Sequence, residues 1–159
     1  MNESPQQGED QPGHTWSVRV SGISEKESKV YAGRTTFSVG KQADFTGDGA
    51  HPSAVELLLG ALGGDLVNGF RRLAEKRGIK IEAIESVVSG RLDNPLVFLG
   101  VVGAEGSPRL GSITATVYVS ADAGQSALQE VWRATLEGSP LVRTLELSTT
   151  LSLSIQPTA

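Results

Sequence analysis

The sequence predicts a mixed α+β fold in which antiparallel sheets pack around one long central helix. Segments that alternate apolar and polar residues lie on both sides of a helical stretch over residues 53–78. Helices and strands do not alternate regularly, which disfavours a parallel sheet built from βαβ units. The chain has 159 residues, of which 38 % are apolar, and this is the size of a single domain with one core.

The N-terminal part predicts a tail followed by three strands. Residues 1–13 are polar, rich in Glu, Gln, Pro and Gly, and lack the apolar region of a secretory signal. We therefore expect a disordered tail there and one domain over residues 14–159. Alternation begins at Trp16, and residues 30–32 and 35–39 predict two further strands.

The long helix is expected to begin at Ser53 and to end before Gly78. Glu56 lies three residues after Ser53 and completes a Ser-x-x-Glu capping box, while Gly78 is typical of a helix C-terminus. One stripe at helical spacing is apolar: Val55, Leu58, Leu59, Leu62, Leu66, Phe70 and Leu73. Gly60 and Gly64 each cost about 1 kcal/mol of helix stability relative to alanine. We expect another element to approach the helix closely at this pair, in the core or at a subunit interface.

The C-terminal half predicts further strands and two helices. The strands are expected, in chain order, over residues 79–90, 96–102, 112–120 and 147–155. The helices are expected over residues 125–138 and 140–145, the second opening with Pro140.

Charge and hydropathy argue against several classes of partner. The net charge is −4, and the 14 basic residues form no stripe, which argues against nucleic acid and anionic membrane surfaces. No apolar run reaches about 18 residues, so we expect no membrane span. Without a targeting segment, the cytoplasm is the expected location.

The complete lack of cysteine limits the chemistry that is available. It excludes disulfides, thiolate metal sites and cysteine nucleophiles together. The two histidines and scattered carboxylates fall short of a metal site with three convergent ligands. No glycine-rich phosphate loop follows a strand and opens a helix, so we expect neither a metal nor a nucleotide cofactor.

Two segments resemble motifs of a known family. Residues 52–65 read PSAVELLLGALGGD. With the rest of the helix they resemble the central helix of the osmotically inducible protein C / organic hydroperoxide resistance (OsmC/Ohr) family. In that family a peroxide-reducing cysteine follows the pair of small residues, and here this position is Asp65. Residues 137–145 resemble the second motif, in which a Cys-Pro pair supplies the resolving thiol, and here Ser139 precedes Pro140.

The resemblance has implications for assembly and activity. It implies an intertwined homodimer with two central helices side by side and the active sites at the subunit interface. It also implies an arginine and a glutamate near the reactive position, for which Arg34 and Glu56 are the nearest matches. The family reduces hydroperoxides in oxidative-stress defence through a sulfenic acid and a disulfide, which Asp65 and Ser139 cannot form.

Each candidate residue also has a purely structural interpretation. Asp65 has no cation three or four residues away, so it requires a distant partner such as Arg34, or else it is a solvated or structurally paired carboxylate. Ser139 is typical of an N-cap before Pro140, and Glu56 of a capping box.

Three functions stay open, and cysteine-based peroxidase activity is not expected. The first is a homodimer that binds a small apolar or peroxide-like ligand or has a regulatory task. The second is an enzyme of another class that uses Asp65, Arg34 and Glu56 in acid–base chemistry. The third is an interaction module whose family pocket is filled by side chains.

Overall fold

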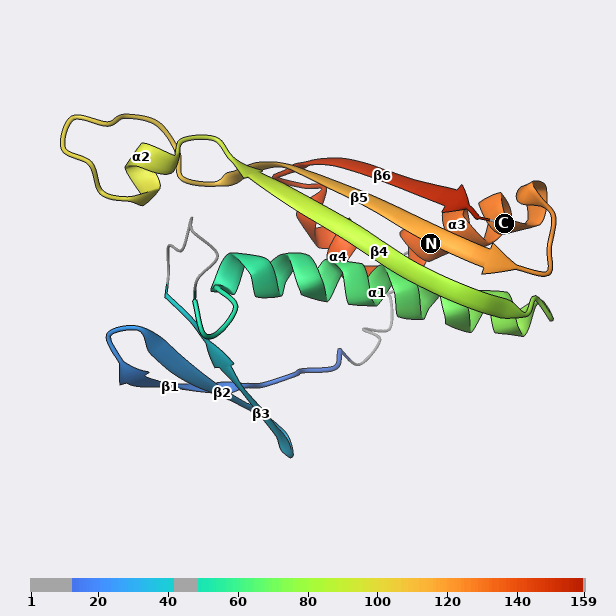
Figure 1. The fold of residues 1–159 in the computed structure, drawn as a ribbon, viewed down its shortest axis with the longest axis horizontal. Coiled ribbons are helices and arrows are strands. Elements are labelled where there is room, and N and C mark those ends of the chain that lie inside the picture. Colours follow the sequence, from blue (N-terminus) through green and yellow to red (C-terminus); the bar gives the residue numbers. More distant parts are fainter. Residues whose placement is uncertain (1–12, 42–48, 159) are drawn as a thin grey trace, which may run out of the picture.

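The chain folds into two three-stranded sheets that lie on either side of one long helix (Figure 1). The computed structural model describes residues 13–41 and 49–158. Its elements are β1 (Arg19–Ser24), β2 (Glu27–Ala32), β3 (Thr35–Val39), α1 (Ala54–Lys76), β4 (Ile81–Leu92), α2 (Pro95–Phe98), β5 (Leu110–Ala121), α3 (Gln125–Gly138), α4 (Pro140–Leu145) and β6 (Thr150–Pro157). This arrangement confirms the predicted α+β class. None of the described helices is long and apolar enough to cross a membrane.

The predicted tail lies outside the described residues, apart from Gly13, which is in no helix or strand. The division into a tail and one domain over residues 14–159 therefore stays a prediction.

The N-terminal sheet is antiparallel, in the order β1-β2-β3. Val20, Val30 and Phe37 lie opposite one another across its three strands and form an apolar row. Only Val30 is buried in the chain as described; Val20 and Phe37 are 58 % and 42 % exposed. The sheet is joined to the start of α1 by a hydrogen bond of 2.8 Å from the Gly40 N–H to the Pro52 carbonyl.

Both predicted ends of α1 are confirmed, and each has a local cause. The Glu56 carboxylate accepts hydrogen bonds from the Ser53 N–H at 2.7 Å and the Ser53 hydroxyl at 2.8 Å, and the Glu56 N–H donates back to Ser53 Oγ at 3.3 Å. At the other end, Gly78 has φ +72° and the Ile79 N–H donates to the Ala74 carbonyl at 3.0 Å. This is the Schellman arrangement that glycine favours after a helix.

The close approach to α1 occurs at a different glycine from the pair that the sequence suggested. A Cβ atom on Gly63 would lie 2.7 Å from Ser86 Oγ and 3.1 Å from a Val88 methyl group, so Gly63 lets α1 lie against β4. A Cβ atom added to Gly60 or Gly64 would meet no atom of another described element within 4 Å. The close neighbour expected at that pair is therefore not within this chain, because α1 turns its Leu62 and Gly63 side toward the sheet, and an approach at a subunit interface stays a prediction.

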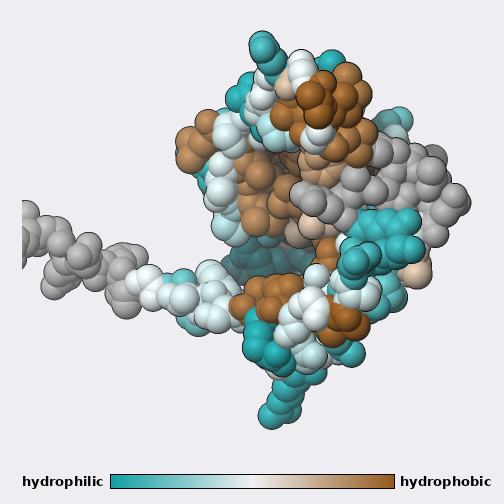
Figure 2. All heavy atoms as spheres, turned by 90° about the vertical axis from the view of Figure 1, so that its left-hand side faces the viewer, coloured by the Kyte–Doolittle hydropathy of each residue, from teal (hydrophilic) through white to brown (hydrophobic). Residues whose placement is uncertain are grey.

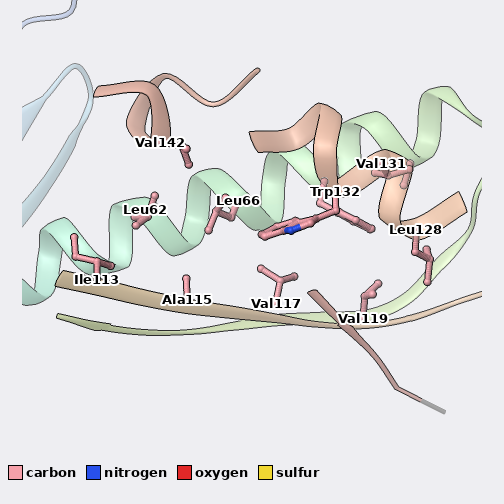
Figure 3. Close-up of a cluster of buried hydrophobic side chains, with 12 residues drawn as sticks. Leu62, Leu66, Ile113, Ala115, Val117, Val119, Leu128, Val131, Trp132 and Val142 are labelled. Atoms are coloured by element: carbon pink, nitrogen blue, oxygen red, sulfur yellow. The ribbon is translucent and has the colours of Figure 1, made fainter. Parts of the chain in front are cut away.

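The C-terminal sheet has the order β4-β5-β6 and carries the core on one face. β4 and β5 pair antiparallel as expected, whereas β5 and β6 pair parallel, so the expectation of purely antiparallel sheets is wrong for this pair. Figure 3 shows Leu62 and Leu66 of α1 and Trp132 of α3 above the apolar row of β5. The buried cluster comprises Leu62, Leu66, Phe70, Ala74, Ile113, Ala115, Val117, Val119, Leu128, Val131, Trp132 and Val142. The sheet, α1 and α3 thus form one core.

The strand expected over residues 96–102 is wrong. This segment begins as the short helix α2, at the far end of the β4–β5 hairpin (Figure 1). The Asn94 side chain accepts from the Leu96 N–H at 3.0 Å and the Val97 N–H at 3.4 Å, and Pro95 occupies the first turn. This N-cap satisfies backbone donors locally, so the start of the apolar run forms the helix α2 and does not join the sheet.

Candidate functional site

Asp65 and Ser139, the two candidate residues that the resemblance places at cysteine positions, meet in the structure. The Ser139 hydroxyl donates a hydrogen bond to Asp65 Oδ2, with 2.5 Å between the oxygens. That separation lies at the short end of the range for a hydroxyl bound to a carboxylate. Ser139 is 4 % exposed and Asp65 is half-buried, so the bond lies largely out of water.

Ser139 also opens the helix that follows it. Its Oγ accepts from the Val142 N–H at 3.0 Å, which makes it the N-cap of α4, with Pro140 in the first turn. The Ser139 hydroxyl therefore donates one hydrogen bond, to Asp65, and accepts another, from the Val142 N–H. The proposed capping role of Ser139 is present, and the bond to Asp65 is added to it.

The packing of α1 on α3 brings the two residues together although they are 74 positions apart. A Cβ atom on Gly69 would lie 3.3 Å from a Thr135 methyl group, so the two helices are close at that level. Since α3 ends at Gly138, the chain reaches Ser139 just beside the middle of α1. The helix crossing thus sets the position of the hydroxyl.

The other two candidate residues lie elsewhere. Arg34 is exposed at the β2–β3 turn, whose tip points away from α1 (Figure 1). Glu56 holds the N-terminus of α1, and at 1.5 Å per residue it lies roughly 13 Å along the helix axis from Asp65. The structure therefore brings Asp65 and Ser139 together but brings neither Arg34 nor Glu56 to them.

Neither histidine is placed to act as the general base for Ser139 as a nucleophile. His51 Nε2 lies 3.5 Å from Glu27 Oε1, and the His14 ring packs edge-on against Trp16 with 4.4 Å between ring centroids. Neither histidine therefore stands beside Ser139. Among the described residues, no group of three or more His, Asp or Glu side chains is placed to hold a metal ion.

Hollows on the surface do not coincide with the Asp65–Ser139 pair. Described residues line four hollows, of about 680, 330, 240 and 200 Å³, and neither residue lines any of these four. The largest lies between α3, α4 and β6, and Val142 contributes to its wall. The second, of about 330 Å³, is lined by Glu56, Leu59, Gly60, Gly63, Ser86 and Val88.

Comparison with known proteins identifies the family. Residues 47–154 match the family model described as OsmC-like protein. The chain belongs to the OsmC-like family. The chain contains no cysteine, so it is a member without thiols, and the resemblance places the two family cysteines at Asp65 and Ser139. No curated protein matches the chain in sequence.

Solved structures agree with this assignment. The OsmC-like protein of Mycoplasma pneumoniae superposes with a TM-score of 0.75 at 13 % identity, over 92 % of this chain and 99 % of that one. The organic hydroperoxide resistance protein OsmC of Legionella pneumophila superposes with a TM-score of 0.63 at 11 % identity, over 92 % of this chain and 99 % of that one. The organic hydroperoxide resistance protein OhrB of Bacillus subtilis superposes with a TM-score of 0.58 at 17 % identity, over 90 % of this chain and 98 % of that one. At these identities the likeness is one of fold.

Sequence reasoning named both members of the pair but did not join them. It offered Arg34 as the partner of Asp65, because a carboxylate in a helix calls for a cation and no cation lay at helical spacing. The available signal was the resemblance, which places a thiol pair at these two positions, because two thiols that form a disulfide must approach each other. The large hollow beside β6 gave no signal in the sequence.

Proposed function

We propose that this protein is a redox-inert member of the OsmC-like family that acts as a homodimer by binding, and not by reducing hydroperoxides. The observation that carries the proposal is the hydrogen bond from the Ser139 hydroxyl to Asp65. Both thiol positions hold oxygen groups, and these groups are bonded to each other.

The chemistry of hydroperoxide reduction supports the proposal. Cleaving the O–O bond to give an alcohol and water takes two electrons, which a thiolate supplies as it becomes a sulfenic acid and then a disulfide. A carboxylate and a hydroxyl cannot supply them in this way. An oxidative-stress role through the family's thiol reaction is therefore not expected for this chain.

Exposed apolar side chains support the homodimer. They gather at the N-terminal sheet and around α2, and Figure 2 shows apolar surface above and below a hollowed region at this end of the molecule. The residues are Trp16, Val18, Val20, Ile23 and Phe37 in the first group and Leu96, Leu99, Val101 and Val102 in the second. Contiguous exposed apolar side chains of this kind are typical of a surface that another protein covers. A second copy would cover it, and the bare Gly60–Gly64 side of α1 would receive the partner helix.

The hydrogen bond between Ser139 and Asp65 bears on what this protein binds. Within one chain, Asp65 and Ser139 are bonded to each other and line none of the four hollows, which supports a family site filled by its own side chains over an open ligand pocket. This favours an interaction or regulatory role over a small apolar or peroxide-like ligand held by Asp65. Acid–base catalysis by Asp65, Arg34 and Glu56 is the least supported alternative, because the three lie apart.

A peroxidase assay with engineered thiols tests the proposal. Wild-type protein should consume cumene hydroperoxide no faster than buffer containing dithiothreitol. The double variant Asp65→Cys/Ser139→Cys should form an intramolecular disulfide on oxidation, seen as a loss of about 2 Da and of both alkylation sites. The single variants Asp65→Cys and Ser139→Cys, which cannot form that bridge, are the matched controls.

Two results would contradict it. Thiol-independent turnover of hydroperoxide by the wild type would show that the oxygen pair is catalytic. Failure of the double variant to cross-link, while it remains folded, would show that the two positions do not approach closely enough to replace a thiol pair. Sedimentation equilibrium tests the homodimer separately, and a single-chain mass at micromolar concentration would refute it.

A further inference from the structure

The C-terminal sheet has one protected edge and one unprotected edge. β4, at one edge, carries Glu82, Glu85 and Arg91, and its pairing with β5 is irregular near both ends. β6, at the other edge, carries no charged residue, and it pairs with β5 in continuous register. Natural proteins block exposed edges with charges and bulges, because unpaired N–H and C=O groups accept a further strand. β6 therefore lacks the features that would prevent strand addition.

The hollow of about 680 Å³, the largest of the four that described residues line, lies directly beside this unprotected edge. Its β6 residues include Leu151 and Leu153, and α3 and α4 contribute Leu136 and Val142. These four form an apolar patch in a hollow whose other walls are polar, and the 83 % exposed Leu147 stands at the rim. Backbone groups of an edge strand and a concave surface with an apolar patch thus occur together, which is a combination that binds extended peptides.

The charges of the hollow disfavour an anionic small molecule. Arg109 Nε is bonded to Asp93 Oδ2 at 2.7 Å, and Arg143 Nη1 to Glu146 Oε1 at 2.8 Å. Both cations of the hollow are thus paired with acids, and Glu137 adds another negative charge. An uncharged backbone with apolar side chains suits this surface better than a carboxylate or a phosphate does.

We propose that the β6 edge and this hollow form a docking site for an extended peptide segment of a partner protein. The segment adds as a strand beside β6 and hydrogen-bonds its outer edge. Because side chains alternate between the two faces of a strand, every second residue enters the hollow, and the others lie on the face of the sheet that carries Ser152. The partner motif is thus an uncharged segment with apolar residues at alternate positions. This site goes beyond the proposed function and does not depend on the Asp65–Ser139 pair.

The test uses the full chain and a defined probe, the blocked heptapeptide Ser-Leu-Thr-Val-Ser-Leu-Gln. Amide hydrogen exchange should slow in residues 150–157 on addition of the probe and stay unchanged in residues 81–92. The same peptide with proline at its central positions lacks the donors for a strand and should give no protection. Protection confined to β4, protection by the proline peptide, or no protection at all would overturn the proposal.

Matched variants locate the site. Leu147→Ser changes an exposed rim residue and should weaken probe binding by about fivefold, in line with the loss of one apolar contact. Val102→Ser changes a fully exposed apolar residue near α2 and should leave the affinity unchanged. Equal affinities of the two variants would refute the hollow as the site. Slowed exchange of β6 in the protein alone, increasing with its concentration, would assign the edge to a second copy and overturn the peptide proposal.

Discussion

Replacing Ser139 by alanine should destabilise the protein strongly, because it removes two interactions of one hydroxyl. The Val142 N–H loses its capping acceptor, which costs about 0.5–2 kcal/mol. Asp65 loses the donor at 2.5 Å, and a hydrogen bond to a charged group contributes about 1.5–3 kcal/mol. The sum is about 2–5 kcal/mol in the free energy of unfolding. For a chain of this length, that lowers the Tm by roughly 4–20 °C.

A double-mutant cycle separates the two contributions. Urea unfolding followed by circular dichroism would be measured for the wild type, Ser139→Ala, Asp65→Ala and the double variant. All four would be measured at one protein concentration, since a dimer's stability depends on it. The coupling energy between the positions should be about 1.5–3 kcal/mol, whereas the capping loss appears only in variants without the hydroxyl. A coupling energy below about 0.5 kcal/mol would refute the assignment of the Asp65–Ser139 bond as the link between α4 and α1.

Three further predictions concern packing and assembly. Gly63→Ala should lower the free energy of unfolding by about 1–3 kcal/mol, because the new methyl group meets β4. Gly64→Ala should instead stabilise an isolated chain by up to about 1 kcal/mol. Equal melting temperatures of the two variants would contradict this. Phe37→Ser should weaken a homodimer about tenfold or more in sedimentation equilibrium, whereas Thr36→Ser on the opposite face of β3 should not; equal dissociation constants would exclude that face from the interface. Arg109→Gln breaks an ion pair whose arginine side chain is 64 % exposed, so urea unfolding should shift by no more than about 1 kcal/mol, and a larger loss would give this pair a structural role.

The parts of the fold that the sequence predicted are those with local causes. The bounds of α1 follow from the Ser53 cap and the Gly78 stop, each of which acts within one helical turn. Helices α3 and α4 begin and end where the periodicity and Pro140 place them. The family assignment likewise depended on two short motifs whose residues could be aligned one by one.

The parts that the sequence did not predict depend on relations between distant elements. An apolar run such as residues 96–102 is compatible with helix and strand, and only the cap at Asn94 decides it. Helical spacing places Gly60 and Gly63 within about 60° of each other around the axis, so the rotation of α1 against β4 determines which glycine is close. The Ser139–Asp65 bond requires the α1–α3 crossing, which no local pattern specifies.

The oxygen pair has a consequence for how this member of the family responds to its surroundings. In a thiol member, oxidation would join the two positions covalently and reduction would separate them, so the link between α1 and the start of α4 depends on redox conditions. Here a hydrogen bond holds the same two positions, and its partners are not changed by mild oxidants or thiol reductants. The bond to Asp65 and the cap of α4 therefore persist together in either environment. The conformation of the α3–α4 corner, which also contributes Leu136 and Val142 to the hollow beside β6, is consequently expected not to depend on redox state.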